Sequence, residues 1–519
     1  MIALTTQQRD LIHKLLNADT VVVMADVAHD LGLTPRQVEY RLKPIRVWLA
    51  QREVTLKTTP GLGIEILCSP EKRSELLHEL ETQTDFQLIL TPGQRRQFFA
   101  LCLLTADSPL IINWLKQMAL VSKSTILSDL DFIDEWVRGH NLTLIRRPNY
   151  GFSLEGTELA QRQALIALLW GDIAFGEPLT KMTYNRGLLF SMTDDVSSLR
   201  LVQYANDIFE NLDIKTMLDL VASAETKLDG RFTDDVVLHL TLAFAVQQYR
   251  IQAGYYVNSN AEMLHWLQEN GIWSVATDIF QNIGNDLSPD NLLAEAAYVA
   301  MHLLAGTRHH VWPGDLYVDP SLTDLITVLM KNVAQAFDVS KLGYDPSLRD
   351  GLFAHIIPAI MRQRFGLWAP STWSDGQLSQ KYIREYNIAR ELSIIITEQT
   401  DIILPDGEID TLTLLLRAAF IRERPHHAKR VFIVCPSGVA TSQLLMARLK
   451  PQFPSLEIIG ILSLRELTSE RVAGAHFLIS TVPIEDLGSN LPVIQVDPLL
   501  FPEDVEAITN YLLGLKIEN

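Results

Sequence analysis

The chain has 519 residues, 47% of them hydrophobic, and its 44 Lys and Arg stand against 62 Asp and Glu, a formal net charge of −18. A chain of this length is expected to fold into about three to five domains, and this composition excludes a disordered protein. Three cysteines provide neither a disulfide framework nor the spacing of a zinc site, so we expect no metal, no cofactor and a reducing, cytoplasmic location. No stretch resembles a secretory signal or a membrane span, so we expect no membrane insertion.

The negative charge is distributed unevenly along the chain. Residues 1–160 hold 17 Lys and Arg and 19 Asp and Glu, a net of −2, so the other 359 residues carry −16. A nucleic-acid footprint is basic, so the overall charge argues against DNA binding. The near-neutral N-terminal third nevertheless leaves room for local basic surfaces, and it has to be interpreted separately.

This N-terminal third contains a repeat at an offset of 88 residues, which indicates a duplicated unit. The matched pairs include Leu33 with Val121, Thr34 with Ser122, Val38 with Ile126, Leu42 with Leu130, Ile45 with Ile133, Trp48 with Trp136 and Gly63 with Gly151. Each copy is predicted to form a short helix, a second helix capped by Thr34 or Ser122, and two strands around a Pro/Gly turn. This order predicts two winged helix-turn-helix domains of mixed α and β structure, at residues 1–68 and 87–157.

The second helix of the first copy is rich in side chains that read DNA. It carries Arg36, Gln37, Arg41, Lys43 and Arg46, against a single acidic residue, Glu39. Arginine and glutamine reach base edges and phosphates in the major groove, so we expect binding to double-stranded DNA. A winged helix used only for protein contacts is the alternative.

The second copy offers fewer DNA-binding side chains. Its second helix has Lys123, opposed by Asp129 and Asp131, and its hairpin has Arg146 and Arg147 for phosphate or minor-groove contact. We therefore expect the first copy to be the stronger reader of DNA.

A helical connector is predicted at residues 158–195, and a second repeat follows at an offset of 112–113 residues. Its pairs are Val236 with Leu348, Leu240 with Leu352, Arg250 with Arg362, Gly254 with Gly366, Glu295 with Glu408 and Tyr298 with Thr411. The region is acidic and poor in strand signals, so we expect two all-helical modules, at residues 198–312 and 318–425.

Two histidines lie in apolar helical stretches of these modules. His302 belongs to the first module, and His355 belongs to the second, with Arg362 two helical turns later on the same face. Histidine accepts phosphoryl groups on nitrogen, and a nearby arginine could bind the phosphate. From the residues alone, a lone histidine in an apolar helix is more often a satisfied core residue. His309, His310, His426 and His427 are expected at the surface or in linkers.

Residues 428–519 are predicted to form a small, doubly wound parallel α/β domain, because short apolar strands alternate with helices. Cys435 ends the first strand and precedes a loop that opens a helix. The helix N-terminus favours an anion and a thiolate, so Cys435 is a candidate nucleophile. The loop residues suited to hold phosphate are Ser437, Gly438, Thr441 and Ser442.

Tandem winged helices followed by two such helical modules resemble the transcription regulators that carry phosphotransferase-system (PTS) regulation domains, or PRDs. These include the mannitol- and lichenan-operon activators and, more distantly, the BglG-type antiterminators. The resemblance implies that His355, in its Leu-x-x-His and Arg362 context, and His302, in Glu-x-x-Tyr-x-x-x-His, are phosphorylated. Ala243 and Leu415 stand at the two other positions where that family has histidines. His239 lies one helical turn before Ala243, and the sequence leaves open whether it substitutes.

The Cys-x-x-Gly-x-x-Thr-Ser stretch from Cys435 resembles the IIB component of the sugar phosphotransferase system, and the resemblance implies transient phosphorylation of this cysteine. A degenerate domain with an inert cysteine is the alternative. A tyrosine-phosphatase loop is disfavoured, because Thr441 occupies the position of its essential arginine. Many relatives continue into a IIA-like domain, which we do not expect here, so the phosphoryl donor to Cys435 is expected to be a separate protein.

Together these features predict a non-enzymatic, DNA-binding transcription activator of a sugar-PTS operon. It is expected to act as a homodimer on operator DNA and to receive phosphoryl groups from HPr and from IIA or IIB proteins. An RNA-binding antiterminator is the first alternative, although such proteins have a small β-rich domain before the PRDs. A phosphotransferase that acts on sugar through phosphocysteine is the second.

Overall fold

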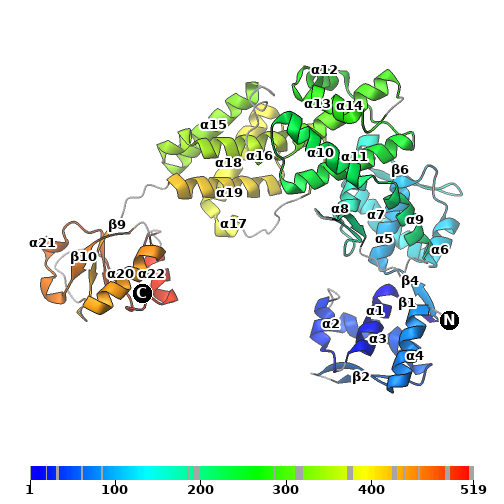
Figure 1. The fold of residues 1–519 in the computed structure, drawn as a ribbon, viewed down its shortest axis with the longest axis horizontal. Coiled ribbons are helices and arrows are strands. Elements are labelled where there is room, and N and C mark those ends of the chain that lie inside the picture. The colour runs from blue at the N-terminus through cyan, green and yellow to red at the C-terminus, as the bar shows by residue number, and fades with distance from the viewer. Residues whose placement is uncertain are drawn as a thin grey trace. The chain divides into compact units, whose positions relative to one another are not determined.

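The computed structural model describes residues 2–512, apart from 19, 31–33, 60–61, 83–85, 184–185, 191–198, 285–286, 310–319, 371–377, 424–428, 437–438, 454–455 and 485–490. The chain divides into two compact units, Met1–Ala419 and Phe420–Asn519, and Figure 1 shows the elements of each. The first unit is mostly helical and the second holds a small parallel sheet, as the sequence predicted.

The two copies of the N-terminal repeat have the same elements in the same order. The first copy comprises β1 (Ile2–Thr5), α1 (Thr6–Asn17), α2 (Met24–Asp30), α3 (Pro35–Ala50), β2 (Thr55–Thr59), β3 (Gly63–Leu67) and α4 (Pro70–Thr82). The second comprises β4 (Phe86–Ile89), α5 (Pro92–Thr105), α6 (Ile112–Ala119), α7 (Lys123–Arg138), β5 (Thr143–Arg147), β6 (Gly151–Glu155) and α8 (Glu158–Trp170). The helices α3 and α7 and both hairpins repeat with the 88-residue offset found in the sequence.

The apolar stripe of α3 forms the core of the first copy. Val38, Leu42, Ile45 and Leu49 are all buried, and so is Trp48. Burial of such a stripe holds a short amphipathic helix against its neighbours, because the buried apolar area is the main favourable term. Four of these five buried residues, Val38, Leu42, Ile45 and Trp48, are positions matched by the 88-residue repeat.

A glycine in each hairpin allows the backbone to pair with the segment just before α2 in the first copy and just before α6 in the second. Gly63 has φ +137° and Gly151 has φ +123°, a region that suits glycine. Ile64 exchanges hydrogen bonds of 2.8 and 2.9 Å with Val22, and Phe152 pairs in the same way with Leu110. A Cβ on Gly63 would lie 2.1 Å from the Val22 carbonyl oxygen, so the repeat requires glycine here.

The connector differs from the helical prediction. Helix α8 (Glu158–Trp170) ends at Gly171, which adopts φ +98°, and a hairpin of β7 (Thr180–Thr183) and β8 (Gly187–Phe190) follows. A left-handed glycine after the last helical turn is the usual helix stop, and it ends the helix here. Helix α8 packs on α5 and on α11.

Two helical modules complete the first unit. The first contains α9 (Arg200–Glu210), α10 (Ile214–Leu228), α11 (Asp234–Gln252), α12 (Ala261–Glu269), α13 (Ile272–Phe280) and α14 (Pro289–Ala305). The second contains α15 (Pro320–Phe337), η3 (Ser340–Tyr344), α16 (Pro346–Phe365), α17 (Leu378–Lys381), α18 (Ile383–Thr400) and α19 (Asp406–Glu423). Helix α14 of the first module packs against α16 of the second, so the two modules share an interface.

The C-terminal unit is a four-stranded parallel sheet in the order β10-β9-β11-β12. Its elements are β9 (Lys429–Val434), α20 (Val439–Gln452), β10 (Leu456–Leu462), η4 (Leu464–Glu466), α21 (Ser469–Val472), β11 (Phe477–Ser480), β12 (Val493–Gln495) and α22 (Pro502–Leu512). The four predicted strands are therefore present. Within the described residues, no helix is long and apolar enough to cross a membrane, and no cluster of side chains suits a metal ion.

Candidate functional site

A cavity of about 440 Å³ lies where the two helical modules meet. Helix α11 contributes His239 to its wall, α14 contributes His302, α16 contributes His355 and Arg362, and α19 contributes Glu408. The structure thus brings together the two histidines and the arginine selected from the sequence. It adds His239, whose role the sequence left open, and Glu408.

The second module supplies the charged pair of the cavity. Arg362 donates a 2.5 Å hydrogen bond to Glu408 Oε1, and His355 Nε2 lies 3.2 Å from Glu408 Oε2. The other guanidinium nitrogen, Nη1, donates to the carbonyl oxygen of Ala305 at 2.6 Å and to Thr307 Oγ1 at 3.2 Å. Arg362 therefore links a carboxylate of its own module to the end of α14 in the other.

A proline in α16 contributes to the same interface between the two modules. Pro358 lies inside α16 and has no N–H, so the carbonyl oxygen of Ala354 receives no helical hydrogen bond from it. The backbone N–H of Arg308, from the segment after α14, lies 3.4 Å from that oxygen and donates to it. The carbonyl group left free in α16 beside His355 therefore forms a hydrogen bond that joins the two modules.

The two histidines of the first module lie next to each other in the wall of the cavity. The rings of His239 and His302 have centroids 5.7 Å apart, and both side chains are more than 90% buried. His239 Nε2 has no hydrogen-bond partner within the described structure. A buried imidazole nitrogen without a partner is unusual, and here it belongs to a residue that lines the cavity.

Burial keeps all three imidazoles uncharged near neutral pH. It lowers the pKa of His239 to about 4, helped by the positive charge of Arg362. It also lowers the pKa of His302 well below the ordinary value, with His239 and Arg162 adding to the effect. The pKa of His355 is lowered by burial, although Glu408 opposes this. A neutral imidazole has a nitrogen lone pair free for nucleophilic attack, which a protonated ring lacks.

Glu408 is ionised in this setting. Burial alone would raise the pKa of its carboxyl group, but Arg362 and His355 hold it below its ordinary value. The cavity therefore contains a carboxylate already bound to the arginine that the sequence proposed as the phosphate partner.

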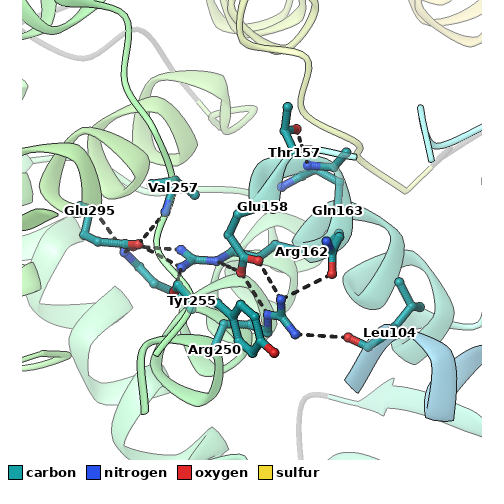
Figure 2. Close-up of polar contacts among 12 residues, drawn as sticks. Leu104, Thr157, Glu158, Arg162, Gln163, Arg250, Tyr255, Val257 and Glu295 are labelled. Carbon is teal, nitrogen blue, oxygen red and sulfur yellow. Dashed lines mark hydrogen bonds and ion pairs between the residues drawn. The ribbon is translucent and has the colours of Figure 1, made fainter. Parts of the chain in front are cut away.

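The first module uses the equivalent charges differently, as Figure 2 shows. Arg250 and Glu295 are the repeat counterparts of Arg362 and Glu408, yet each bonds a residue of α8. Arg250 contacts Glu158 at 2.6 Å, and Glu295 contacts Arg162 at 2.7 Å, with Arg162 also bonded to Glu158 at 2.9 Å. Helix α8 thus inserts an ion pair into the first module.

Helix α8 also contacts residues that line the cavity. Gln163 Oε1 accepts a 2.8 Å hydrogen bond from the backbone N–H of Trp368, and its amide nitrogen lies 3.4 Å from His302 Nε2. The ring of Trp170, at the end of α8, packs against His239 with centroids 6.4 Å apart. At its other side, α8 packs on α5, and Arg250 donates to the Leu104 carbonyl oxygen of α5 (Figure 2).

The predicted DNA-reading side chains on α3 differ in exposure. Arg36 and Lys43 are exposed, whereas Arg41 bonds Gln7. Arg46 is half-buried, at 2.7 Å from Glu39 and 2.8 Å from Thr58. The side chain of Gln37 lies outside the described residues.

In the second copy, Lys123 is exposed at the start of α7, and Arg147 is exposed in β5. Arg146 is bonded to Asp131 at 2.6 Å. Asp129, taken from the sequence as a charge on the exposed face of this helix, is instead buried and bonded to Arg95 at 2.6 Å and to Arg96 at 3.1 Å. It therefore holds α7 against α5 and does not oppose Lys123.

In the C-terminal unit, Cys435 follows β9, is 5% exposed and packs in the apolar core of the sheet. Thr441 is half-buried and Ser442 is buried on α20, while Ser437 and Gly438 lie outside the described residues. The backbone N–H of Thr481, after β11, donates to the Val434 carbonyl oxygen at 3.0 Å. Cys435 and Thr481 thus lie at the carboxyl ends of neighbouring strands, where open α/β sheets bind ligands.

Comparison with known proteins gives matches over part and over nearly all of the chain. A family model for the PRD domain matches residues 329–419, within the second helical module. The chain is 25% identical to "Probable licABCH operon regulator" of Bacillus subtilis (strain 168), over 98% of this chain and 76% of the relative. It is 20% identical to "Transcriptional regulator ManR" of the same organism, over 99% of this chain and 76% of that relative.

The chain is a PRD-containing transcriptional regulator. The family expected from the sequence is thereby confirmed, and so is the expectation of a non-enzyme, because both relatives are named as regulators. The IIB-like assignment of residues 428–519 in this regulator stays a proposal.

Sequence reasoning missed several residues that shape the site of the regulator. Glu158, Arg162 and Gln163 lie in a segment interpreted only as a connector. An Arg four residues after a Glu on a helix was a visible signal of an ion pair, but its partners in the other helices were not. Ala243 and Leu415, at the two positions without histidine, lie in α11 and α19, and His239 reaches the cavity wall one turn from Ala243. Of the other histidines, His309 is exposed, and His310, His426 and His427 lie outside the described residues.

Proposed function

We propose that this regulator is a cytoplasmic, DNA-binding activator of a sugar-PTS operon, controlled by phosphorylation of His302 and His355. The observation that carries the proposal is the cavity that both histidines line together with Arg362. Uncharged, buried imidazoles next to a guanidinium group suit the acceptance and binding of a phosphoryl group. The relatives named for the licABCH operon and ManR support control of an operon.

The phosphoryl step needs only the neutral histidine and a phosphorylated donor. A lone pair on a ring nitrogen of His302 or His355 attacks the phosphorus atom, and a new N–P bond forms. The bond between phosphorus and the donor's own histidine, on HPr or a IIA protein, or cysteine, on a IIB protein, breaks, and its electron pair stays on the donor. Each imidazole keeps its own N–H, so no further proton has to move in a transfer between histidines.

DNA binding is assigned to the two helix–helix–hairpin domains at residues 1–68 and 87–157. Arg36 and Lys43 on α3, Lys123 on α7 and Arg147 on β5 are exposed basic side chains on the elements that winged helices present to DNA. Arg41, Arg46 and Arg146 contact neighbouring side chains, and they would exchange these contacts for phosphates. A homodimer would place two such surfaces on a symmetric operator.

The C-terminal unit is assigned as a IIB-like domain with Cys435 as its phosphoryl acceptor. Its four parallel strands and the position of Cys435 at a strand end before a helix support this assignment. The thiol is buried among apolar side chains, so we expect it to become accessible only when a donor protein docks.

The test is phosphorylation of the purified chain with phosphoenolpyruvate, enzyme I and HPr, with and without IIA or IIB proteins. His302→Ala, His355→Ala and Cys435→Ala variants are labelled in parallel, and the occupancy of operator DNA is measured by footprinting. We expect each variant to lose its own labelled site and the wild type to change occupancy on phosphorylation. Equal labelling of all variants would refute the sites, and binding to leader RNA alone would refute DNA control.

A further inference from the structure

Among the described residues that line the cavity between the modules, there is one cationic side chain for three imidazoles. Among the described residues that line it, Arg362 is the only arginine or lysine, whereas His239, His302 and His355 all face it. Arg162, whose charge reaches His302, is fully buried and already bonded to Glu158 and Glu295. A phosphoryl group in this cavity therefore has one arginine available to it.

That arginine is already occupied by an anion of the protein. Glu408 binds Arg362 Nη2 at 2.5 Å and lies 3.2 Å from His355 Nε2, so the carboxylate fills the space between the acceptor nitrogen and the cation. A phosphoryl group on His355 would carry about −1.5 to −2 charges into that space. Two anions would then compete for one guanidinium group, and the carboxylate is the weaker charge.

We propose that the inter-module cavity is one phosphate compartment shared by the histidines of both modules, in which Glu408 holds the phosphate position until a phosphoryl group displaces it from Arg362. This rests on the proposed phosphorylation of His302 and His355. One compartment with one cation holds one phosphoryl group at a time, because a second dianion would be buried without a counter-charge. Modification in one module therefore excludes modification in the other.

The release of Arg362 also has a structural consequence. Its guanidinium group bonds Glu408 on one side and the Ala305 carbonyl oxygen and Thr307 on the other. When Arg362 turns toward a phosphate, its bonds to Glu408 and to the end of the first module change together. Phosphorylation at either module is thus sensed at the same interface, which explains how two acceptor sites could send one signal.

The experiment counts phosphoryl groups per chain by native mass spectrometry near neutral pH. It uses the full chain with Cys435→Ser, so that only histidines are counted, and phosphoenolpyruvate, enzyme I and HPr as donors. The variants are His302→Ala, His355→Ala and the triple variant that also carries His239→Ala. We expect at most one cavity phosphoryl group on the parent chain, one on each single variant, and none on the triple variant.

The outcomes separate this inference from the proposed function. Two phosphoryl groups in the cavity of the same chain would overturn the sharing and leave the phosphorylation sites intact. If either His302→Ala or His355→Ala accepts no phosphoryl group, the cavity has only one acceptor histidine, which would also overturn the sharing. No labelling of any histidine would refute the proposed function itself, and the shared compartment with it.

Glu408→Gln tests the displacement directly. It removes the competing charge but keeps the side-chain shape, so we expect labelling of His355 to become several-fold faster and to rise relative to His302. Asp235→Asn is the matched control, because Asp235 lines the same cavity and, in the described part of the structure, forms no hydrogen bond or ion pair with His355 or Arg362. An unchanged or lower share of label on His355 in the Gln variant would contradict the role of Glu408.

Discussion

Arg162 and Glu295 form an ion pair in which neither side chain is exposed to solvent, and they join the connector helix α8 to the first helical module. Arg162 Nη2 bonds Glu295 Oε1 at 2.8 Å as well, so the pair is bidentate. In the second module, the equivalent carboxylate of Glu408 pairs with an arginine of its own module. Two copies of one repeat thus use the same glutamate for different purposes, one to anchor α8 and the other to occupy the cavity.

Removal of one member of this pair should destabilise the first unit. We expect Arg162→Met to reduce the free energy of unfolding by about 3–5 kcal/mol, because it leaves Glu295 buried without its counter-charge. Urea titration followed by circular dichroism measures this loss. Arg138→Met is the matched control, since Arg138 pairs with Asp134 at the surface and should cost no more than about 1 kcal/mol. Adding Glu295→Gln to Arg162→Met should recover part of the loss, and an additive double variant would contradict the pairing.

The buried histidines predict a loss of stability in mild acid. Burial depresses the folded-state pKa of His239, His302, His355 and, in the second copy of the N-terminal repeat, His140. Below the unfolded-state value of about 6.5, the unfolded chain binds protons that the folded chain does not. Stability should therefore be full above this pH and fall on acidification, by about 1.4 kcal/mol per pH unit for each histidine still neutral in the folded state.

For His239, the fall should continue to about pH 4, where its folded-state pKa lies. Urea midpoints measured between pH 7.5 and 5 give the slope, and His239→Asn should lower the proton uptake on unfolding by about one. Thr411→Ser changes the same cavity without removing a titratable group and should leave the slope unchanged. Equal slopes in the wild type and the Asn variant would show that His239 is not buried uncharged.

The hairpin glycines should not tolerate a side chain. We expect Gly63→Ala to destabilise the first copy of the N-terminal repeat by at least about 1–3 kcal/mol, because the backbone is left-handed and the Cβ meets the Val22 carbonyl oxygen. Amide exchange at Val22 and Ile64 reports the loss locally. Gly271→Ala, where φ is −56° and the added Cβ meets no atom, should instead stabilise by about 0.4–1 kcal/mol.

The exposed basic residues of α3 should govern the proposed DNA affinity. We expect Arg36→Ala and Lys43→Ala each to weaken operator binding and to lower the slope of log affinity against log salt by about one, if each neutralises one phosphate. A base contact by Arg36 would also relax the sequence preference. Lys215→Ala, on the exposed side of α10, is the control and should change neither quantity. Salt-independent losses in both α3 variants would argue that this helix contacts protein.

Gln163 should transmit the state of the cavity to the region proposed to bind DNA. It contacts His302 and Trp368 from α8, and α8 packs on α5. We expect Gln163→Ala to leave the number of phosphoryl groups unchanged but to remove most of the effect of phosphorylation on operator affinity, a coupling of about 5–150-fold in such proteins. Gln203→Ala, on the exposed face of α9, should retain the coupling. Loss of phosphorylation in the Gln163 variant would mean that it shapes the acceptor site.

The sequence alone determined most of the elements and both repeats, but neither the β7–β8 hairpin of the connector nor the place of Glu408 in the cavity. The 88-residue offset predicted both helix–helix–hairpin units, because apolar spacing, capping residues and turn glycines act over a few residues. It also predicted that His355 and Arg362 share a face, since helical periodicity fixes positions seven residues apart. The matched family and its regulatory role followed from the order of these units.

Only the tertiary structure decided which charges meet. Asp129 turned inward to Arg95 and Arg96, His239 joined His302 and His355, and α8 placed Arg162 against Glu295. These partners are up to 133 residues apart in the chain. No local pattern records such a separation, because the contact depends on how whole helices pack. The shared cavity exists because α14 of one module packs on α16 of the next, a relationship that neither repeat contains by itself.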